Sequence, residues 1–112
     1  MKVDKPWGYE EWIFVGDSYA FKKLFMLRGH SCSLQFHVKK HETVYVVSGE
    51  LNFEVGDTAD ELVSHSLGAG DFWVIDPGTV HRMSAVKDTF YLEASTPQLD
   101  DVVRISDIYG RE

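Results

Sequence analysis

The chain has 112 residues, 44% of them hydrophobic and 13% aromatic, which fits one compact domain over residues 1–112. Its formal net charge of −7 disfavours general binding to nucleic acid or to an anionic membrane surface. Cys32 is the single cysteine and cannot form an intramolecular disulfide, the N-terminal segment lacks the apolar core of a secretory signal, and no apolar run approaches the length of a membrane helix. We therefore expect a soluble, cytoplasmic protein.

Short apolar segments separated by Gly, Pro or Asp recur along the chain, and this punctuation is typical of antiparallel β-structure. In chain order the predicted strands are WIFV (12–15), FKKLFML (21–27), SLQFH (33–37), VYVVSG (44–49), LNFEV (51–55), DFWVID (71–76) and FYLEAS (90–95). Residues 56–71 read as a long polar connection around a short strand, and residues 97–112 fit either a helical turn or a last strand. The expected fold class is all-β, a sandwich or a closed barrel.

Two of the predicted strands show clear alternation of apolar residues. The alternating residues are Leu51, Phe53 and Val55 in one strand and Phe90, Leu92 and Ala94 in the other. Side chains of a strand point alternately to its two faces, so we expect each set to form the buried face of its strand.

Two histidines and a glutamate lie among strand formers in the segment SLQFHVKKHETVYVVSG. If the strands on either side of residues 38–41 form a hairpin, His37 and Glu42 lie opposite each other, with Cβ atoms about 5 Å apart. The period of a strand returns Gln35 to the same face, whereas His41 stays in the loop. These donors could hold a metal ion, or His37 and Glu42 could form an ordinary solvent-facing pair, and the hairpin alone leaves both interpretations open.

A second candidate turn lies in the segment GAGDFWVIDPGTVHRMSAV. Pro77 and Gly78 suit the central positions of a type II turn, because proline fixes the first φ and glycine accepts a positive second φ. If this turn closes a hairpin, Asp76 and His81 face each other. Strand parity alone does not bring the two predicted hairpins together.

The spacing of these residues resembles the two signatures of the cupin family, which implies a single-domain jelly-roll barrel, or double-stranded β-helix. The positions of the first signature are Gly29, Gln35, His37, Glu42 and Gly49, and those of the second are Gly70, Gly78 and His81. The chain departs from the pattern at Gln35, where most cupins carry a histidine. It departs again at Asp76, which takes the usual proline position, with Pro77 shifted by one.

The segments KPWGYEEW, SLQFH and LDDVVRISDIYGRE further resemble cupins related to mannose-6-phosphate isomerase, particularly the type II isomerase domain. This resemblance implies one divalent metal ion held by Gln35, His37, Glu42 and His81. Two imidazoles, a carboxylate and an amide oxygen suit Zn, Mn, Fe, Co or Ni better than Ca. Among these ions, the resemblance to the isomerases favours zinc.

The same resemblance implies an aldose–ketose isomerisation of substrates such as mannose 6-phosphate and fructose 6-phosphate. Glu93 is the candidate general base, with an exposed strand carboxylate as the alternative. Lys22, favoured over Lys23 because strand parity points only one of them inward, could polarise a hydroxyl or steer a phosphate. Arg104 and Arg111 could bind the phosphate in a bidentate manner, although each could equally be a solvated surface cation.

Two other functions fit the same pattern. One is a metal-dependent cupin oxygenase, because one fold supports different chemistries. The other is a carbohydrate-binding cupin without catalytic activity. As partners we expect a small sugar or sugar phosphate, no nucleic acid and no membrane. The resemblance to cupins also implies a homodimer, which would cover edge strands.

Overall fold

The computed structural model describes residues 1–111, and Glu112, the last residue of the predicted domain, lies outside this range. The described residues form eleven β-strands. These are β1 (Lys2–Lys5), β2 (Gly8–Val15), β3 (Ala20–Met26), β4 (Leu34–Phe36), β5 (Glu42–Ser48), β6 (Glu50–Gly56), β7 (Val63–Gly68), β8 (Phe72–Ile75), β9 (Val80–Ala85), β10 (Thr89–Ser95) and β11 (Val103–Ser106). In residues 1–111 we find no helix that is long and apolar enough to cross a membrane.

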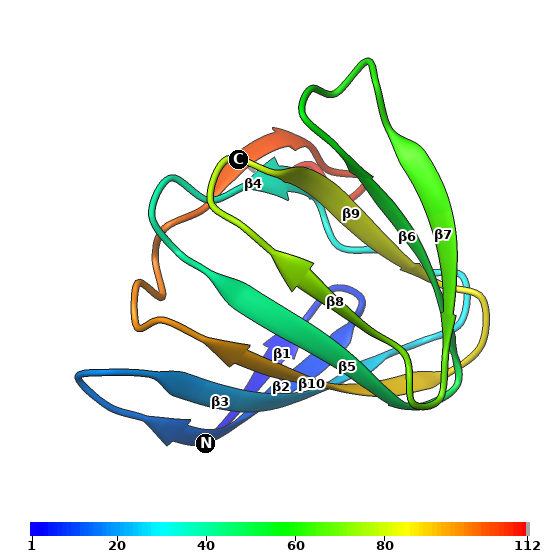
Figure 1. The fold of residues 1–112 in the computed structure, drawn as a ribbon. Helices are drawn as coiled ribbons and strands as arrows, with labels where there is room; N and C mark the ends of the chain where they lie inside the picture. Colours follow the sequence, from blue (N-terminus) through cyan, green and yellow to red (C-terminus); the bar gives the residue numbers. More distant parts are fainter. Residues whose placement is uncertain (112) are drawn as a thin grey trace.

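The strands form two sheets that face each other (Figure 1). The six-stranded sheet has the order β1-β2-β3-β10-β5-β8, and the five-stranded sheet has the order β11-β4-β9-β6-β7. Neighbouring strands pair in antiparallel fashion. This arrangement is a jelly roll, which confirms the predicted all-β fold class. The C-terminal strand, β11, lies beside β4.

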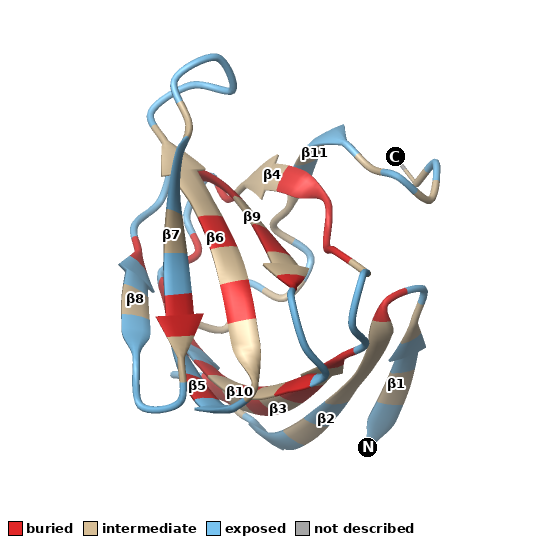
Figure 2. Cartoon of the chain, turned by 90° about the vertical axis from the view of Figure 1, so that its right-hand side faces the viewer, coloured by how far each residue is buried: buried red, intermediate tan, exposed pale blue. Residues whose placement is uncertain are grey.

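The hydrophobic core lies between the two sheets, where their inner faces meet. On β6, Leu51 and Phe53 are fully buried and Val55 packs against the core, so the alternation predicted for this strand is confirmed. Figure 2 shows these buried positions as bands that alternate with less buried ones along the strand. Burial of such side chains is the main favourable contribution to folding.

The buried face of β10 is the opposite of the predicted one. Thr89, Tyr91, Glu93 and Ser95 are buried, whereas Phe90 and Leu92 are only partly buried and Ala94 is exposed. The prediction was wrong because it assigned the apolar residues to the interior. The inner face of β10 meets the hydrophobic core at Tyr91 and a cavity lined by several charged side chains at Glu93. Its outer face is covered in part by aromatic packing, with the rings of Phe90 and Phe25 4.6 Å apart.

The two predicted hairpins are also wrong. Strand β4 pairs with β9 and β11, whereas β5 pairs with β10 and β8, so the connection between β4 and β5 crosses from one sheet to the other. The connection between β8 and β9 crosses in the same way. His37 and Glu42 are therefore not cross-strand partners, and neither are Asp76 and His81. A connection of a few residues can either join neighbouring strands of one sheet or cross to the facing sheet, so the length of the connection does not distinguish the two arrangements.

The turn at Pro77 and Gly78 has the predicted type II character even though it connects different sheets. Gly78 has a φ of 84°, and the backbone N–H of Thr79 donates to the carbonyl of Asp76 at 3.1 Å. A positive φ at this position favours glycine. The turn lies against the connection between β4 and β5, because the N–H of Gly78 donates to the carbonyl of His37 at 2.7 Å.

Candidate metal centre and its cavity

Three side chains of types that can bind a metal ion meet between the sheets at one end of the barrel. His37 follows β4 and His81 lies on β9, both in the five-stranded sheet, whereas Glu42 begins β5 in the six-stranded sheet. Glu42 Oε1 lies 3.2 Å from His37 Nε2 and 3.6 Å from His81 Nε2. One ligand atom from each residue lies within 4.8 Å of the others, and all three residues are buried. The donors converge because inner faces of opposing sheets meet here.

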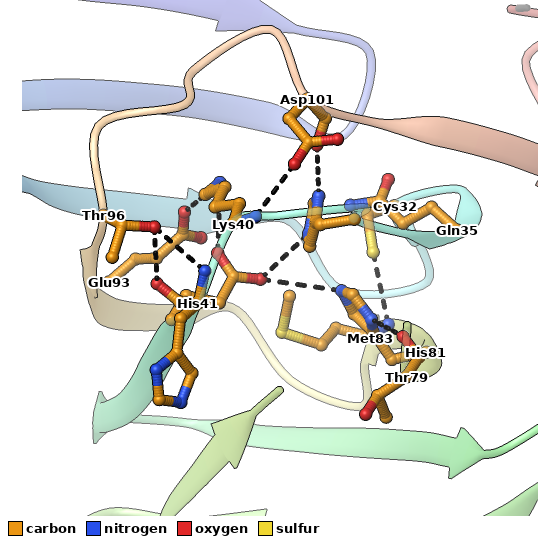
Figure 3. Close-up of polar contacts among 12 residues, drawn as sticks. Cys32, Gln35, Lys40, His41, Thr79, His81, Met83, Glu93, Thr96 and Asp101 are labelled. Carbon is orange, nitrogen blue, oxygen red and sulfur yellow. Dashed lines mark hydrogen bonds and ion pairs between the residues drawn. The ribbon is translucent and has the colours of Figure 1, made fainter. Parts of the chain in front are cut away.

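Each imidazole is oriented by a backbone carbonyl on its outer side. His37 Nδ1 donates to the carbonyl of Asp101 at 2.6 Å, and His81 Nδ1 donates to the carbonyl of Thr79 at 3.0 Å (Figure 3). A ring that donates from Nδ1 presents Nε2 to the interior, and this arrangement is typical of histidines that bind metal ions. The Nε2 atom of His81 is buried and has no hydrogen-bond partner within the described structure.

These observations fit a divalent transition-metal ion. The donor set combines two imidazole nitrogens with one carboxylate oxygen, which suits Zn, Mn, Fe, Co or Ni. A buried polar nitrogen without a partner is otherwise costly, and a bound ion would satisfy it. His37, Glu42 and His81 would therefore hold the ion.

The electrostatics of the cluster favour a charged Glu42. Burial alone would raise its pKa, but the hydrogen bond from His37 and the charge of Lys40 hold the pKa of Glu42 well below its usual range. For His37, burial alone would lower the pKa, but the hydrogen bond to Glu42 and the negative charge of Glu42 raise the pKa above its ordinary value. Burial lowers the pKa of His81.

Lys40 links Glu42 of this cluster to a second carboxylate. Its Nζ lies 3.1 Å from Glu42 Oε2 and 3.2 Å from Glu93 Oε1, and all three side chains are buried. Figure 3 shows Glu93 beside Lys40, on the side away from His81. Burial and the negative charge of Glu42 raise the pKa of Glu93 to about 7. A carboxylate with such a pKa can accept and release protons near neutral pH.

These groups lie along one cavity of about 200 Å³. Among its lining residues are His37, Lys40, Glu42 and Glu93, and also the predicted site residues Gln35, Lys22, Arg104 and Arg111. His81 is fully buried behind this lining. The structure thus brings all the predicted site residues to one end of the barrel.

Lys22 is the buried lysine of its pair, on β3 directly opposite Glu93 of β10, whereas Lys23 is only partly buried. The Lys22 ammonium lies 3.5 Å from Glu10 Oε1 and 4.9 Å from the centre of the Trp12 ring. It therefore already has an acidic partner. Arg111 is likewise held by Asp107, with hydrogen bonds of 3.0 and 3.1 Å.

Gln35 lies beside the cluster, because its backbone pairs with that of His81 across β4 and β9. Its side-chain carbonyl oxygen accepts a hydrogen bond from the Ser33 hydroxyl. An amide oxygen has a second lone pair that can still bind a cation. Its role as the fourth ligand stays a prediction.

Sequence reasoning did not find Lys40, Asp101 or Glu10. Lys40 does lie in the connection between β4 and β5, as the sequence predicts, but its side chain turns inward to Glu42 and Glu93, which its place in a connection does not indicate. Asp101 reaches the site from a segment far along the chain, and no local pattern marks it. His41 is exposed at the rim, where its Nε2 lies 3.0 Å from Asp76 Oδ1, away from the buried cluster.

A family model described as a cupin domain matches residues 25–94, and the chain belongs to the cupin family. This match confirms the family that the two signatures predicted. It covers β4, β5 and β9, the strands from which the clustered donors come.

Curated relatives match almost the whole chain. Mannose-1-phosphate guanylyltransferase of Escherichia coli strain K12 is 33% identical over 116 residues, which is 98% of this chain and 23% of that protein. Xanthan biosynthesis protein XanB of Xanthomonas campestris is 30% identical over 98% of the chain and 24% of the protein. Alginate biosynthesis protein AlgA of Pseudomonas putida is 30% identical over 99% and 23%. The chain therefore spans about a quarter of the length of the curated relatives it matches.

Solved structures of similar fold include KdgF from Halomonas sp., with a TM-score of 0.78, 20% identity, and coverage of 89% of this chain and 88% of that one. Oxalate decarboxylase from Bacillus subtilis has a TM-score of 0.81 and 18% identity over 94% of this chain and 30% of that one. At such identities the likeness establishes the fold alone.

Proposed function

We propose that this cupin is a metal-dependent sugar-phosphate isomerase that interconverts an aldose and a ketose, such as mannose 6-phosphate and fructose 6-phosphate. The observation that carries the proposal is the position of Glu93. It lines the same cavity as His37 and Glu42 but lies outside the cluster of metal donors, so it is available for proton transfer. The name of the Escherichia coli relative, a mannose-1-phosphate guanylyltransferase, supports a phosphorylated sugar as the ligand.

The reaction moves one proton between neighbouring carbons of the open-chain sugar. Glu93 takes the proton from the hydroxyl-bearing carbon next to the carbonyl; the electron pair of that C–H bond forms a carbon–carbon double bond, and the π pair of the carbonyl moves onto its oxygen to give an enediolate. The proton of the neighbouring hydroxyl then moves to this oxygen, which leaves the negative charge on the other oxygen. A carbonyl forms there as the protonated Glu93 returns its proton to the former carbonyl carbon, which completes the exchange of aldose and ketose. A divalent ion bound by His37, Glu42 and His81 would stabilise the negative charge that develops on the sugar oxygens.

Lys40 keeps the two carboxylates close together throughout this cycle. Its ammonium lies between Glu42 and Glu93, and it offsets the repulsion that the two negative charges would otherwise experience. The burial of all three side chains reduces their exposure to water, which strengthens these interactions.

The phosphate of the substrate would bind at the basic side chains of the cavity. Lys22, Arg104 and Arg111 line it, and an arginine can bind a phosphate through two parallel N–H donors. Because Glu10 pairs with Lys22 and Asp107 pairs with Arg111, the phosphate would compete with these carboxylates.

The direct test is an assay of mannose 6-phosphate and fructose 6-phosphate interconversion by protein reconstituted with Zn, Mn, Fe, Co or Ni. We expect Glu93→Gln to lower kcat by about 100- to 10,000-fold while the protein still binds metal. Glu11→Gln, which changes an exposed carboxylate on β2, should leave the rate unchanged.

The absence of turnover with every metal and with related hexose phosphates would reject the isomerase. Oxygen consumption by the iron-loaded protein would instead indicate the oxygenase, and sugar binding without turnover would indicate a carbohydrate-binding cupin. The homodimer stays a prediction, and sedimentation equilibrium would test it.

A further inference from the structure

Asp101 contacts the connection between β4 and β5, which carries one metal donor at its start. The Asp101 carboxylate accepts hydrogen bonds from the backbone N–H groups of Val38, Lys39 and Lys40, at 3.0, 2.7 and 2.8 Å. These donors lower the pKa of the Asp101 carboxyl. Three consecutive N–H groups that point at one carboxylate form a local anion site, and here the chain fills it with its own side chain.

The backbone of the same residue holds a metal donor. The carbonyl of Asp101 accepts the hydrogen bond from His37 Nδ1 at 2.6 Å. Figure 3 shows the carboxylate of Asp101 bonded to Lys40. One residue therefore fixes both the ring of His37 and the backbone that follows it.

Strand pairing explains why Asp101 reaches this position. In the antiparallel pair of β11 and β4, Val103 lies opposite Phe36 and Arg104 lies opposite Gln35. Continuing this register beyond the strand ends places Asp101 beside Val38. The contact is thus a consequence of the sheet and joins residues that are 63 positions apart.

The contacts of Asp101 hold the middle of the connection, whose ends are held by other residues. Gly78 bonds the carbonyl of His37 at one end, and Thr96 accepts a hydrogen bond from the N–H of His41 at 3.0 Å at the other. Between these ends Val38 is 60% exposed, so packing contributes little to its position. Asp101 thus fixes the backbone from which the side chain of Lys40 reaches Glu42 and Glu93.

We propose that Asp101 is a positioning residue of the metal centre: its carbonyl directs His37 Nε2 toward Glu42 and His81, and its carboxylate fixes Lys40 between Glu42 and Glu93. This inference rests on the proposed metal-dependent function. Removing the side chain keeps the Asp101 carbonyl but breaks the three bonds that hold residue 101 against the backbone of residues 38–40. The carbonyl and the His37 ring then lose their fixed relative position. We therefore predict a looser metal site, because groups that orient a ligand typically contribute about 10- to 100-fold to metal affinity.

The test compares wild-type protein with Asp101→Ala, Asp101→Asn and a matched control, Asp88→Asn. Asp88 makes the same kind of bond, accepting from the backbone N–H of Arg28 at 2.8 Å, but it does not line the cavity. The readouts are Co²⁺ affinity, measured by competition with a chelator, and the visible absorption spectrum of the bound Co²⁺. The imidazole ¹⁵N shifts of His37 in metal-free protein provide a third readout.

Asp101→Ala should weaken Co²⁺ binding by about 10- to 100-fold, change the Co²⁺ spectrum, and shift the His37 nitrogens away from the Nδ1-donating form. Asp101→Asn keeps one acceptor oxygen and should fall between Asp101→Ala and wild type. Asp88→Asn can lower thermal stability but should leave all three site readouts unchanged.

The inference would be overturned if both Asp101 variants kept the Co²⁺ affinity, the Co²⁺ spectrum and the His37 nitrogen shifts of wild type. It would also be overturned if Asp88→Asn changed these readouts as much as the Asp101 variants do. If wild-type protein binds no divalent ion, the proposed function fails, and the His37 shifts of the metal-free variants then decide whether Asp101 positions this ring. The two failures are therefore distinguishable.

Discussion

Lys40 Nζ lies 3.2 Å from Glu93 Oε1, and this buried ion pair joins residues that are 53 positions apart. The pair extends the cluster of His37, Glu42 and His81 into the cavity, because the same ammonium lies 3.1 Å from Glu42 Oε2. Two carboxylates so close together need a shared cation or a proton to be stable when buried. The charges of this site are therefore interdependent.

Replacing Lys40 by methionine should destabilise the metal-free protein. The change leaves two buried carboxylates without their shared partner, and breaking a buried pair in this way costs roughly 3–5 kcal/mol. Chemical denaturation at pH 8 would measure the free energy of unfolding. Lys39→Met is the matched control because Lys39 is exposed, and an equal loss in both variants would contradict the account.

The stability of the metal-free protein should depend on pH through Glu93. Its pKa is raised from 4.5 to about 7, so between these values the folded state binds more protons than the unfolded state, and raising the pH costs stability. Glu93→Gln removes this titration. The free energy of unfolding of Glu93→Gln, relative to that of wild type, should therefore increase by roughly 3 kcal/mol between pH 4.5 and 7. Above pH 7 this difference should stay constant.

Denaturation curves of both proteins across this pH range would check the sign. A difference between wild type and Glu93→Gln that stays constant with pH would show that the carboxyl of Glu93 titrates normally.

Gln35→Ala should weaken metal binding by about 10-fold or more if the amide oxygen is the fourth ligand. Calorimetric titration with Zn²⁺ would measure this affinity. Gln98→Ala is the matched control, because Gln98 is exposed and does not line the cavity. Unchanged affinity in Gln35→Ala would remove this residue from the ligand set.

Lys22→Met should weaken binding of a sugar phosphate by about 10-fold. A hydrogen bond to a charged group contributes roughly 1.5–3 kcal/mol, and the effect should lie at the low end because the Lys22 ammonium also pairs with Glu10. The corresponding unphosphorylated sugar should bind equally to both proteins. Lys23→Met, on the outer face of the same strand, provides the control. Equal effects of Lys22→Met on both sugars would exclude a contact with the phosphate.

Much of the fold could be predicted from the sequence because turn residues and strand formers alternate along it. The predicted strands are all present, and residues 103–106 form the last strand rather than a helical turn. What failed was the pairing. Both predicted hairpins assumed that consecutive strands return within one sheet, whereas residues 37–41 and 76–79 cross between sheets.

The residues that cluster between the sheets could nevertheless be named from the sequence, because the family signatures specify positions along the chain and do not depend on a pairing model. His37, Glu42 and His81 meet across the barrel, not within a hairpin. Lys40 and Asp101 were missed for a physical reason. The bonds of Asp101 to the connection after β4, and the ion pair of Lys40 with Glu93, join segments far apart in sequence. A cavity lined by charged side chains also turns polar residues of β10 inward, against the usual rule that apolar residues lie inside.

The central claim is that His37, Glu42 and His81 form a metal centre. Calorimetric titration of chelator-treated protein with Zn²⁺ tests it most directly, with His81→Ala as the comparison, because His81 Nε2 is buried without a hydrogen-bond partner among the described residues. We predict one Zn²⁺ ion bound per chain in wild type and loss of that binding in His81→Ala. Absence of binding in wild type, or equal affinity in His81→Ala, would contradict the account.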